Sequence, residues 1–209
     1  VGRVSGDVLL QLADLVEAHG SQRLRTTPHQ KVVVLDIEQD RVDSLVKGLE
    51  EIGLYANPSP WRRSTIACTG IEYCKLAIVD TKDTATEAVA ELEKRIGANE
   101  LLRPLTLHVN GCPNSCARIQ TADIGLKGQL LPDGNGGQTP GFQVHLGGGL
   151  ASDSREEAGT GRTVRGLKVT ADDLPDYVER VTRRFLADRA DEDQSFAEWA
   201  LAAEEEALQ

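Results

Sequence analysis

The chain has 209 residues, of which 40% are apolar, and its formal net charge is −10. A chain of this length buries a sizeable core, and we expect one or two domains. The acidic balance argues against double-stranded nucleic acid as a partner, because its phosphates repel such a surface. The sequence contains neither a long apolar stretch nor a signal-peptide pattern, so we expect a cytoplasmic protein without membrane contact.

The sequence begins at Val1 and contains no methionine. An intact translation product starts with methionine, and a chain of this size without an internal one is uncommon. We therefore expect the C-terminal part of a longer protein, with part of its active site elsewhere.

The first 56 residues predict a helix, a strand and a second helix, which is half of a small ferredoxin-like α+β unit. The first helix covers residues 7–19, with Asp7 as its N-cap and Gly20 as its stop. Residues 31–37 read KVVVLDI, a continuous β-branched run that predicts a buried strand. The second helix covers residues 40–53. The inward faces of the two helices are expected to carry Val8, Leu9, Leu12, Leu15 and Val16, and Val42, Leu45, Val46 and Leu49.

The remaining residues predict a mixed arrangement of helices and strands. Two prolines in residues 56–63 indicate a linker or domain boundary. Residues 151–162 are rich in Gly, Ser and charge, and we expect them to be mobile. Strands are expected at 105–110, 122–128 and 141–148, the last two as a hairpin, and helices at 83–96, 171–189 and 194–207. The expected buried faces are Ala85, Ala88, Val89, Leu92 and Ile96, and Phe196, Trp199, Ala200 and Ala203.

Four cysteines in two pairs carry most of the functional information. Cys68 and Cys74 lie in ACTGIEYC, and Cys112 and Cys116 lie in NGCPNSCAR. Thiolates in such pairs are typical of a multinuclear metal centre. A CxxxC spacing puts both thiolates on one side of a helical turn, and Pro113 suits the first turn of a helix. We therefore expect the second pair at a helix N-terminus, where the dipole stabilises negative charge.

Other chemistry is compatible with four cysteines. Zinc favours gaps of two to four residues between its ligands. The five-residue gap between Cys68 and Cys74 therefore favours a metal centre larger than a single zinc ion. A [4Fe–4S] cube takes four cysteine ligands and tolerates varied spacing, and Gly70 and Gly111 would let the backbone approach it. Two disulfides are a further alternative, although nothing in the sequence indicates export. Neither pair is the CxxC of a catalytic dithiol.

At these motifs the chain resembles the C-terminal half of the sirohaem-containing sulfite and nitrite reductases. The resemblance rests on ACTGIEYCKLA and NGCPNSCARIQTADIG, with LRTTPHQKVVV and FQVHLGG in support. Actinobacterial ferredoxin-dependent assimilatory sulfite reductases look most similar. The resemblance implies an α+β fold, with a ferredoxin-like half-domain over residues 1–56 and an α/β sirohaem and [4Fe–4S] domain over residues 57–209.

The resemblance also implies a ligand set. Cys68, Cys74, Cys112 and Cys116 would hold one [4Fe–4S] cluster. Cys116 would also bridge to the sirohaem iron, which makes it the residue expected to act in catalysis. Further sirohaem contacts are implied for Arg25 and Gln30 on the first strand, and for Ala77, Asn114 and Ser115 near the cysteines. Outside the family, Arg25 would be a surface charge, Gln30 a turn residue and Asn114 the left-handed residue of its loop.

The implied reaction is the six-electron reduction of sulfite to sulfide with ferredoxin as electron donor. Ferredoxin–nitrite reductase, which converts nitrite to ammonia, is the alternative in chemistry. A non-haem iron–sulfur electron carrier and a zinc-stabilised binding module are the alternatives in class. In the family, the cations that grip the small anion come mainly from the N-terminal half, so we expect the chain alone to be inactive.

Several other residues invite a role. Lone histidines on strands, such as His108 and His145, are more often structural, and we assign them none. Gly147 to Gly149 could offer backbone N–H groups to a sirohaem carboxylate. Arg62 and Arg63 could dock ferredoxin, which is acidic, whereas the acidic C-terminal helix would repel it.

Overall fold

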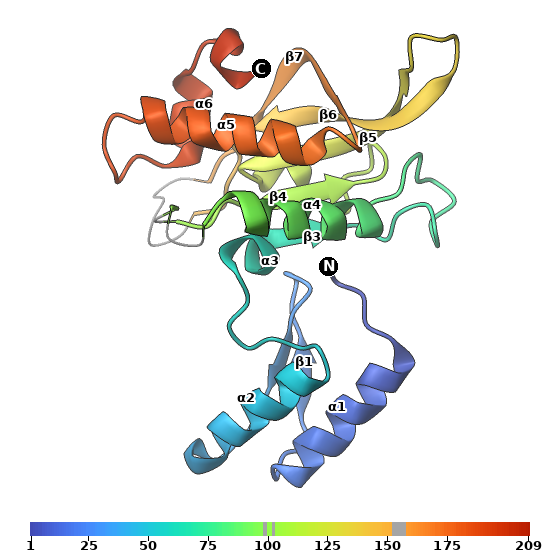
Figure 1. The fold of residues 1–209 in the computed structure, drawn as a ribbon, viewed down its shortest axis with the longest axis vertical. Coiled ribbons are helices and arrows are strands. Elements are labelled where there is room, and N and C mark those ends of the chain that lie inside the picture. The colour runs from blue at the N-terminus through green and yellow to red at the C-terminus, as the bar shows by residue number, and fades with distance from the viewer. Residues whose placement is uncertain (98–99, 102, 152–157) are drawn as a thin grey trace. The chain divides into compact units, whose positions relative to one another are not determined.

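The computed structural model describes residues 1–97, 100–101, 103–151 and 158–209. It divides into two compact units, Gly2–Pro58 and Ser59–Gln209, and the second unit also includes Val1. In the described part of the chain, no helix combines the length and apolarity needed to cross a membrane. Figure 1 traces both units along the chain.

The unit Gly2–Pro58 contains two helices and a two-stranded antiparallel sheet. Its elements are α1 (Gly6–Ala18), β1 (Leu24–Thr26), β2 (Val32–Val34), the short 3₁₀ helix η1 (Gln39–Arg41) and α2 (Val42–Glu51). Helix α1 begins one residue before the predicted start, because Ser5 and not Asp7 is the N-cap: its hydroxyl accepts a hydrogen bond from Val8 N. Gly20, with a φ of +88°, ends the helix as predicted.

The predicted burial of the β-branched run in residues 31–37 is wrong. Val32 and Val33 are exposed at 47% and 43%, because β2 pairs with β1 alone and the pair forms a ribbon whose side chains stay uncovered in this unit. The predicted helix faces are right in part. Leu12, Val16 and Leu45 are buried, whereas Leu9 is 47% exposed.

The unit Ser59–Gln209 is built on a five-stranded sheet of order β3-β4-β5-β6-β7. Strands β3 to β5 are parallel, and the hairpin β5–β6 and strand β7 continue the sheet in antiparallel pairs. The predicted strands and hairpin are confirmed, whereas β3 and β7 were not predicted. The bounds are Thr65–Ala67, Leu107–Asn110, Ile124–Pro132, Gln138–Leu146 and Arg162–Thr170.

Helices α4 (Lys82–Arg95) and α5 (Leu174–Asp188) lie side by side against this sheet (Figure 1). The predicted inward face of α4 is confirmed, since all five of its apolar residues are buried. Alternate sheet residues complete the core on that side. These include Leu107, Val109, Ile124, Leu126, Phe142, Val144 and Leu146.

Three segments differ between the prediction and the structure. Part of the expected linker is the short helix α3 (Pro60–Ser64), which starts because Ser59 caps it and Pro60 suits its first position. The last helix, α6 (Phe196–Ala202), is shorter than predicted and is followed by the 3₁₀ helix η3 (Glu205–Leu208). Half of the predicted mobile segment 151–162, namely residues 152–157, lies outside the described residues.

Candidate metal centre at the ends of strands β3 and β4

Both cysteine pairs follow directly from neighbouring parallel strands. Cys68 comes after Ala67, the last residue of β3, and Cys112 comes two residues after Asn110, the last residue of β4. The two strands are in register, with Ala67 opposite Val109. Because parallel strands end at the same edge, both cysteine loops leave the sheet at one place, which is where α/β sheets bind their ligands.

Backbone hydrogen bonds join the two loops. Cys68 N donates to Val109 O at 2.9 Å, and Ile78 N donates to Gly111 O at 2.7 Å. Gly111 N donates to Cys68 Sγ at 3.2 Å, so an amide of the second loop points at a sulfur of the first. Hydrogen bonds to ligand sulfurs are one of the ways in which proteins set the properties of iron–sulfur sites.

Asn110, which the sequence reasoning did not single out, shapes the second loop. Its side chain is fully buried; Nδ2 donates to Cys112 O at 2.7 Å, and Oδ1 accepts from Ala117 N at 2.8 Å. One amide side chain thus closes the loop at both ends. The available signal was an asparagine placed between a buried strand and a Gly-Cys pair.

The predicted helix at the second cysteine pair is wrong. Residues 111–118 form turns, because Ser115 and Arg118 adopt φ values of +58° and +57° that no helix accommodates. Arg118 N donates to Ser115 O at 2.8 Å and closes one of these turns. Cys112 and Cys116 are therefore held by a loop and not at the start of a helix.

Glycine is needed at both predicted positions for packing between protein segments. A Cβ on Gly111 would lie 3.0 Å from Val79 O and 3.1 Å from Ala77 Cβ. Gly70 has a φ of +78°, and a Cβ there would lie 2.6 Å from Thr81 Oγ1. The cysteine loops therefore pack tightly against the segment that leads into α4.

The four cysteines are free thiols, and their exposure differs. Cys112 is buried, Cys68 and Cys74 are half-buried, and Cys116 is exposed. Across the residues that the structure describes, no three Cys, His, Asp or Glu side chains group closely enough to hold a metal ion. In a cubane each thiolate binds a different iron, so its ligands spread around a larger object than a single ion.

The predicted sirohaem contacts fall into two groups. Near the cysteines, Ala77 is half-buried and Asn114 is exposed. The hydroxyl of Ser115 is engaged inside the loop, where it donates to Gln120 Oε1 and accepts from Ile119 N. Asn114 does not have a left-handed backbone, which in this loop belongs to Ser115 and Arg118.

Arg25 and Gln30 belong to the unit Gly2–Pro58. Arg25 is exposed on β1. Gln30 is not on the strand: it lies in the turn between β1 and β2 with a φ of +57°, and its N–H donates to Thr27 O at 3.0 Å. Pro28 accounts for the difference, because its ring removes the N–H that a continuing strand would need.

The N–H groups of Gly147 to Gly149 are not directed at a ligand. They donate to Asp123 O, Ala122 O and Gly159 O, each at 2.9 Å, so the suggestion that they bind a carboxylate is wrong. His108 is buried, and its Nδ1 lies 3.1 Å from Arg118 O beside the second cysteine loop.

His145 lies on β6, with Nδ1 3.0 Å from Thr163 Oγ1. Burial lowers the pKa of His145 below its ordinary value, and the charge of Lys127 lowers that pKa further. The imidazole is therefore held in its neutral form at physiological pH, as expected for a structural histidine.

Of the two arginines suggested for docking, Arg62 is paired. Its guanidinium contacts Glu93 through Nη2 and Nε at 2.7 and 3.1 Å, and the pKa of Glu93 is lowered mainly by this hydrogen-bonded contact. Arg63 is exposed on the same short helix.

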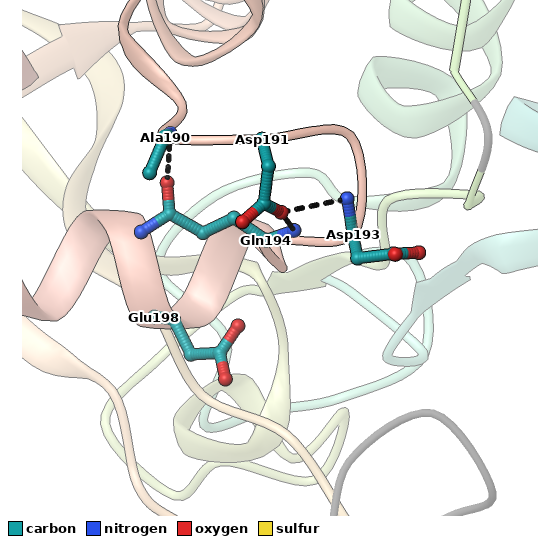
Figure 2. A pocket seen from close by; sticks show the side chains of 5 residues that line it. All are labelled: Ala190, Asp191, Asp193, Gln194 and Glu198. Carbon is teal, nitrogen blue, oxygen red and sulfur yellow. Dashed lines mark hydrogen bonds between the residues drawn. The ribbon is translucent and has the colours of Figure 1, made fainter.

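An open hollow of about 450 Å³ lies at the turn between α5 and α6 (Figure 2). Its lining is acidic, but the carboxylate of Asp191 is engaged by the N–H groups of Asp193 and Gln194, both at 2.9 Å. The hollow is thus the surface of a hydrogen-bonded turn. Its lining residues are Ala190, Asp191, Asp193, Gln194 and Glu198.

Comparison with known families covers both units. A family model described as the nitrite and sulphite reductase 4Fe-4S domain matches residues 60–197, and one described as the nitrite/sulfite reductase ferredoxin-like half domain matches residues 1–52. The chain belongs to the nitrite and sulphite reductase family. The resemblance inferred from the cysteine motifs and the expected α+β fold are confirmed. The expected cofactors, a [4Fe–4S] cluster and sirohaem, are those of this family.

Individual relatives agree. The chain is 53% identical to sulfite reductase (ferredoxin) 2 of Mycolicibacterium paratuberculosis and 51% identical to sulfite reductase (ferredoxin) of Mycobacterium tuberculosis, in both cases over 99% of the chain and 37% of the relative. It is 37% identical to the chloroplastic ferredoxin–nitrite reductase of Zea mays over 74% of the chain and 27% of that protein. The chain thus spans just over a third of the length of these sulfite reductases.

A solved structure of the NirA protein of Mycobacterium tuberculosis superimposes with a TM-score of 0.93 at 51% identity, over 99% of this chain and 37% of that one. Dissimilatory sulfite reductase I superimposes with a TM-score of 0.73 at 11% identity, which shows a shared fold.

The residues present fit a thiolate-ligated cluster. Four free cysteines lie on two loops at one end of adjacent strands, and an amide N–H already points at one of the sulfurs. Cys116 is exposed, so its sulfur is accessible to a bound group.

Proposed function

We propose that this chain forms the cluster- and sirohaem-binding part of a ferredoxin-dependent sulfite reductase that acts in the cytoplasm. The observation that carries the proposal is the junction of the two cysteine loops, in which Gly111 N donates to Cys68 Sγ at 3.2 Å. The sequence identity of 51–53% with mycobacterial sulfite reductases supports sulfite as the substrate.

In this proposal, Cys68, Cys74, Cys112 and Cys116 would hold the cluster, and Cys116 would also hold the sirohaem. The difference in exposure supports this division of roles, since Cys112 is buried in the loop and Cys116 faces outward. When bound, the cluster and sirohaem supply the single-electron chemistry that reduces sulfite to sulfide. Ala77, Asn114, Ser115, Arg25 and Gln30 are proposed sirohaem contacts.

The chain's own residues hold this arrangement. Asn110 fixes both ends of the loop that carries Cys112 and Cys116, and Gly111 allows that loop to pack against Ala77 and Val79. Such fixed positioning is the contribution a protein makes to cofactor chemistry. Ferredoxin would donate the electrons, and Arg63, an exposed cation of α3, could contact it.

The test is an assay of the complete polypeptide loaded with both cofactors. We expect sulfide to form from sulfite in proportion to the reduced ferredoxin consumed. Nitrite is the second candidate substrate, because a ferredoxin–nitrite reductase is 37% identical over 74% of the chain. A higher kcat/KM for nitrite than for sulfite would overturn the choice of substrate, and no turnover of either would overturn the proposed function.

A further inference from the structure

Three consecutive residues at the start of helix α4, Asp80, Thr81 and Lys82, make different contacts. The carboxylate of Asp80 accepts hydrogen bonds from Asp83 N at 3.1 Å and Thr84 N at 3.0 Å, and so satisfies the first N–H groups of the helix. Thr81 occupies the N-cap position, but its side chain makes no capping hydrogen bond. The side chains of Thr81 and Lys82 are thereby available for other contacts.

Both side chains turn back to the end of strand β3. Thr81 Oγ1 donates to Cys68 O at 2.8 Å, and Lys82 Nζ donates to Ala67 O at 2.8 Å. Two successive carbonyls at the start of the first cysteine loop are therefore held from α4. Cys68 Sγ itself lies 3.8 Å from Thr81 Oγ1, which places this contact beside the proposed ligand sulfur.

Lys82 is an unusual residue at this position. Its side chain is buried, with a relative exposure of 8%, whereas lysines are almost never fully buried. It is also the first residue of α4, where the helix dipole disfavours a cation. Desolvation and the dipole both oppose an ammonium here, and the hydrogen bond to Ala67 O ties this cation to the end of β3.

The proposed cluster ligand Cys68, next to Ala67, gives the positive charge of Lys82 a role. A [4Fe–4S] cluster with four thiolate ligands is anionic, and its reduction adds one more negative charge. A cation in a buried position stabilises that charge more than an exposed cation does, because less water screens it. The electrons come from ferredoxin in the proposed reaction, and no bond forms or breaks in the reduction of the cluster.

We propose that Lys82 is a positioning residue for the iron–sulfur site, which holds the end of β3 through Ala67 and raises the reduction potential of the cluster. The inference rests on the proposed ligand role of Cys68. It concerns the reduction potential, which a charge beside the cluster changes directly.

The test compares Lys82→Met, Lys82→Arg and a control in the complete polypeptide with both cofactors. The control is Lys75→Met, which removes the same charge from an exposed position directly after Cys74. The potential of the cluster is measured by redox titration followed by electron paramagnetic resonance. We expect Lys82→Met to lower it by about 59 mV, a tenfold change in a one-electron equilibrium. Lys82→Arg and Lys75→Met should stay near the unsubstituted protein.

An unchanged potential in Lys82→Met, or an equal shift in Lys75→Met, would overturn the inference. If Lys82→Met fails to retain iron, the iron content of Lys82→Arg decides. Iron retained in Lys82→Arg supports a need for positive charge at this position. Iron lost in Lys82→Arg shows that only the shape of the side chain matters, and overturns the inference. If the unsubstituted protein itself lacks a cluster signal, the proposed function fails, and that outcome is distinct from a failure of the inference.

Discussion

The backbone N–H of Gly111 donates a hydrogen bond to Cys68 Sγ at 3.2 Å, and so connects two cysteine motifs that lie 43 positions apart in sequence. The contact exists because strands β3 and β4 are parallel neighbours that end together. A glycine suits this position, since a Cβ there would lie only 3.0 Å from Val79 O and 3.1 Å from Ala77 Cβ.

Gly111→Ala should therefore loosen the junction of the loops. We expect a loss of about 1–3 kcal/mol in the free energy of unfolding, as for other overpacked sites, together with a lower iron content. Both are measured on purified protein, by denaturant unfolding and by iron analysis. Gly6→Ala is the control, because a Cβ at Gly6 meets nothing within 4 Å in a helix. Equal stability and iron content in Gly111→Ala and the parent would contradict this account of the junction.

Asn110→Ala should be more damaging. It removes both side-chain hydrogen bonds of Asn110. Cys112 O and Ala117 N in the loop then lose the partner that this side chain supplies. An unsatisfied buried group costs about 1–3 kcal/mol, so we expect about 2–5 kcal/mol in the free energy of unfolding. Asn135→Ala, in the exposed hairpin turn, should change it by less than about 0.5 kcal/mol. The same small effect at both positions would rule out the role given to Asn110.

Cys116→Ser tests the proposed bridge. Because Cys116 is exposed, the substitution should leave the far-ultraviolet circular dichroism and the unfolding midpoint nearly unchanged. In the loaded complete polypeptide we expect the absorption of the sirohaem to be lost or strongly altered. Cys112→Ser, at a buried position in the same loop, should instead lower stability as well as cluster content. A sirohaem spectrum that is the same with and without Cys116 would show that another group binds the iron.

His145 should make stability depend on pH. Burial lowers its pKa in the folded state, so below the ordinary value of 6.5 the unfolded chain binds a proton that the folded chain does not. Stability contributed by neutral His145 is therefore present above pH 6.5 and falls as the pH drops below it. Melting temperatures at pH 5.5 and 7.5 should differ less in His145→Gln than in the parent, and His29→Gln, at an exposed position, should behave like the parent. An unchanged difference in His145→Gln would contradict the assignment.

The parts of the fold that the sequence predicted are those in which local pattern and packing agree. The apolar face of residues 83–96 repeats with helical period, and all five of its residues are buried in α4 or at its C-cap. The hairpin of β5 and β6 was evident from its glycine-rich turn. Strand β3, with three residues, is too short to leave a pattern, and β7 is rich in charge and interrupted by Gly166, which has a φ of +75°.

The ligand set of the candidate site stays a prediction of the sequence, and the geometry of its loops required the structure. The spacing of the cysteines indicates thiolate ligation whatever the loop conformation. The expected helix after Cys112 did not form, because the side chain of Asn110 captures the backbone at Cys112 and Ala117 and Ser115 turns left-handed. Such contacts join a strand end to a loop and have no sequence period. The burial of Lys82 also required the structure, since an N-terminal helix lysine is ordinarily solvated.

The absorption spectrum of the purified complete polypeptide, with its iron and acid-labile sulfide content, tests the central claim most directly. We expect a Soret band and a far-red band of sirohaem, with iron in excess of the haem and sulfide in proportion to a [4Fe–4S] cluster. A broad shoulder without haem bands would indicate a plain iron–sulfur electron carrier. Bound zinc without absorption would contradict the claim that Cys68, Cys74, Cys112 and Cys116 hold a redox centre.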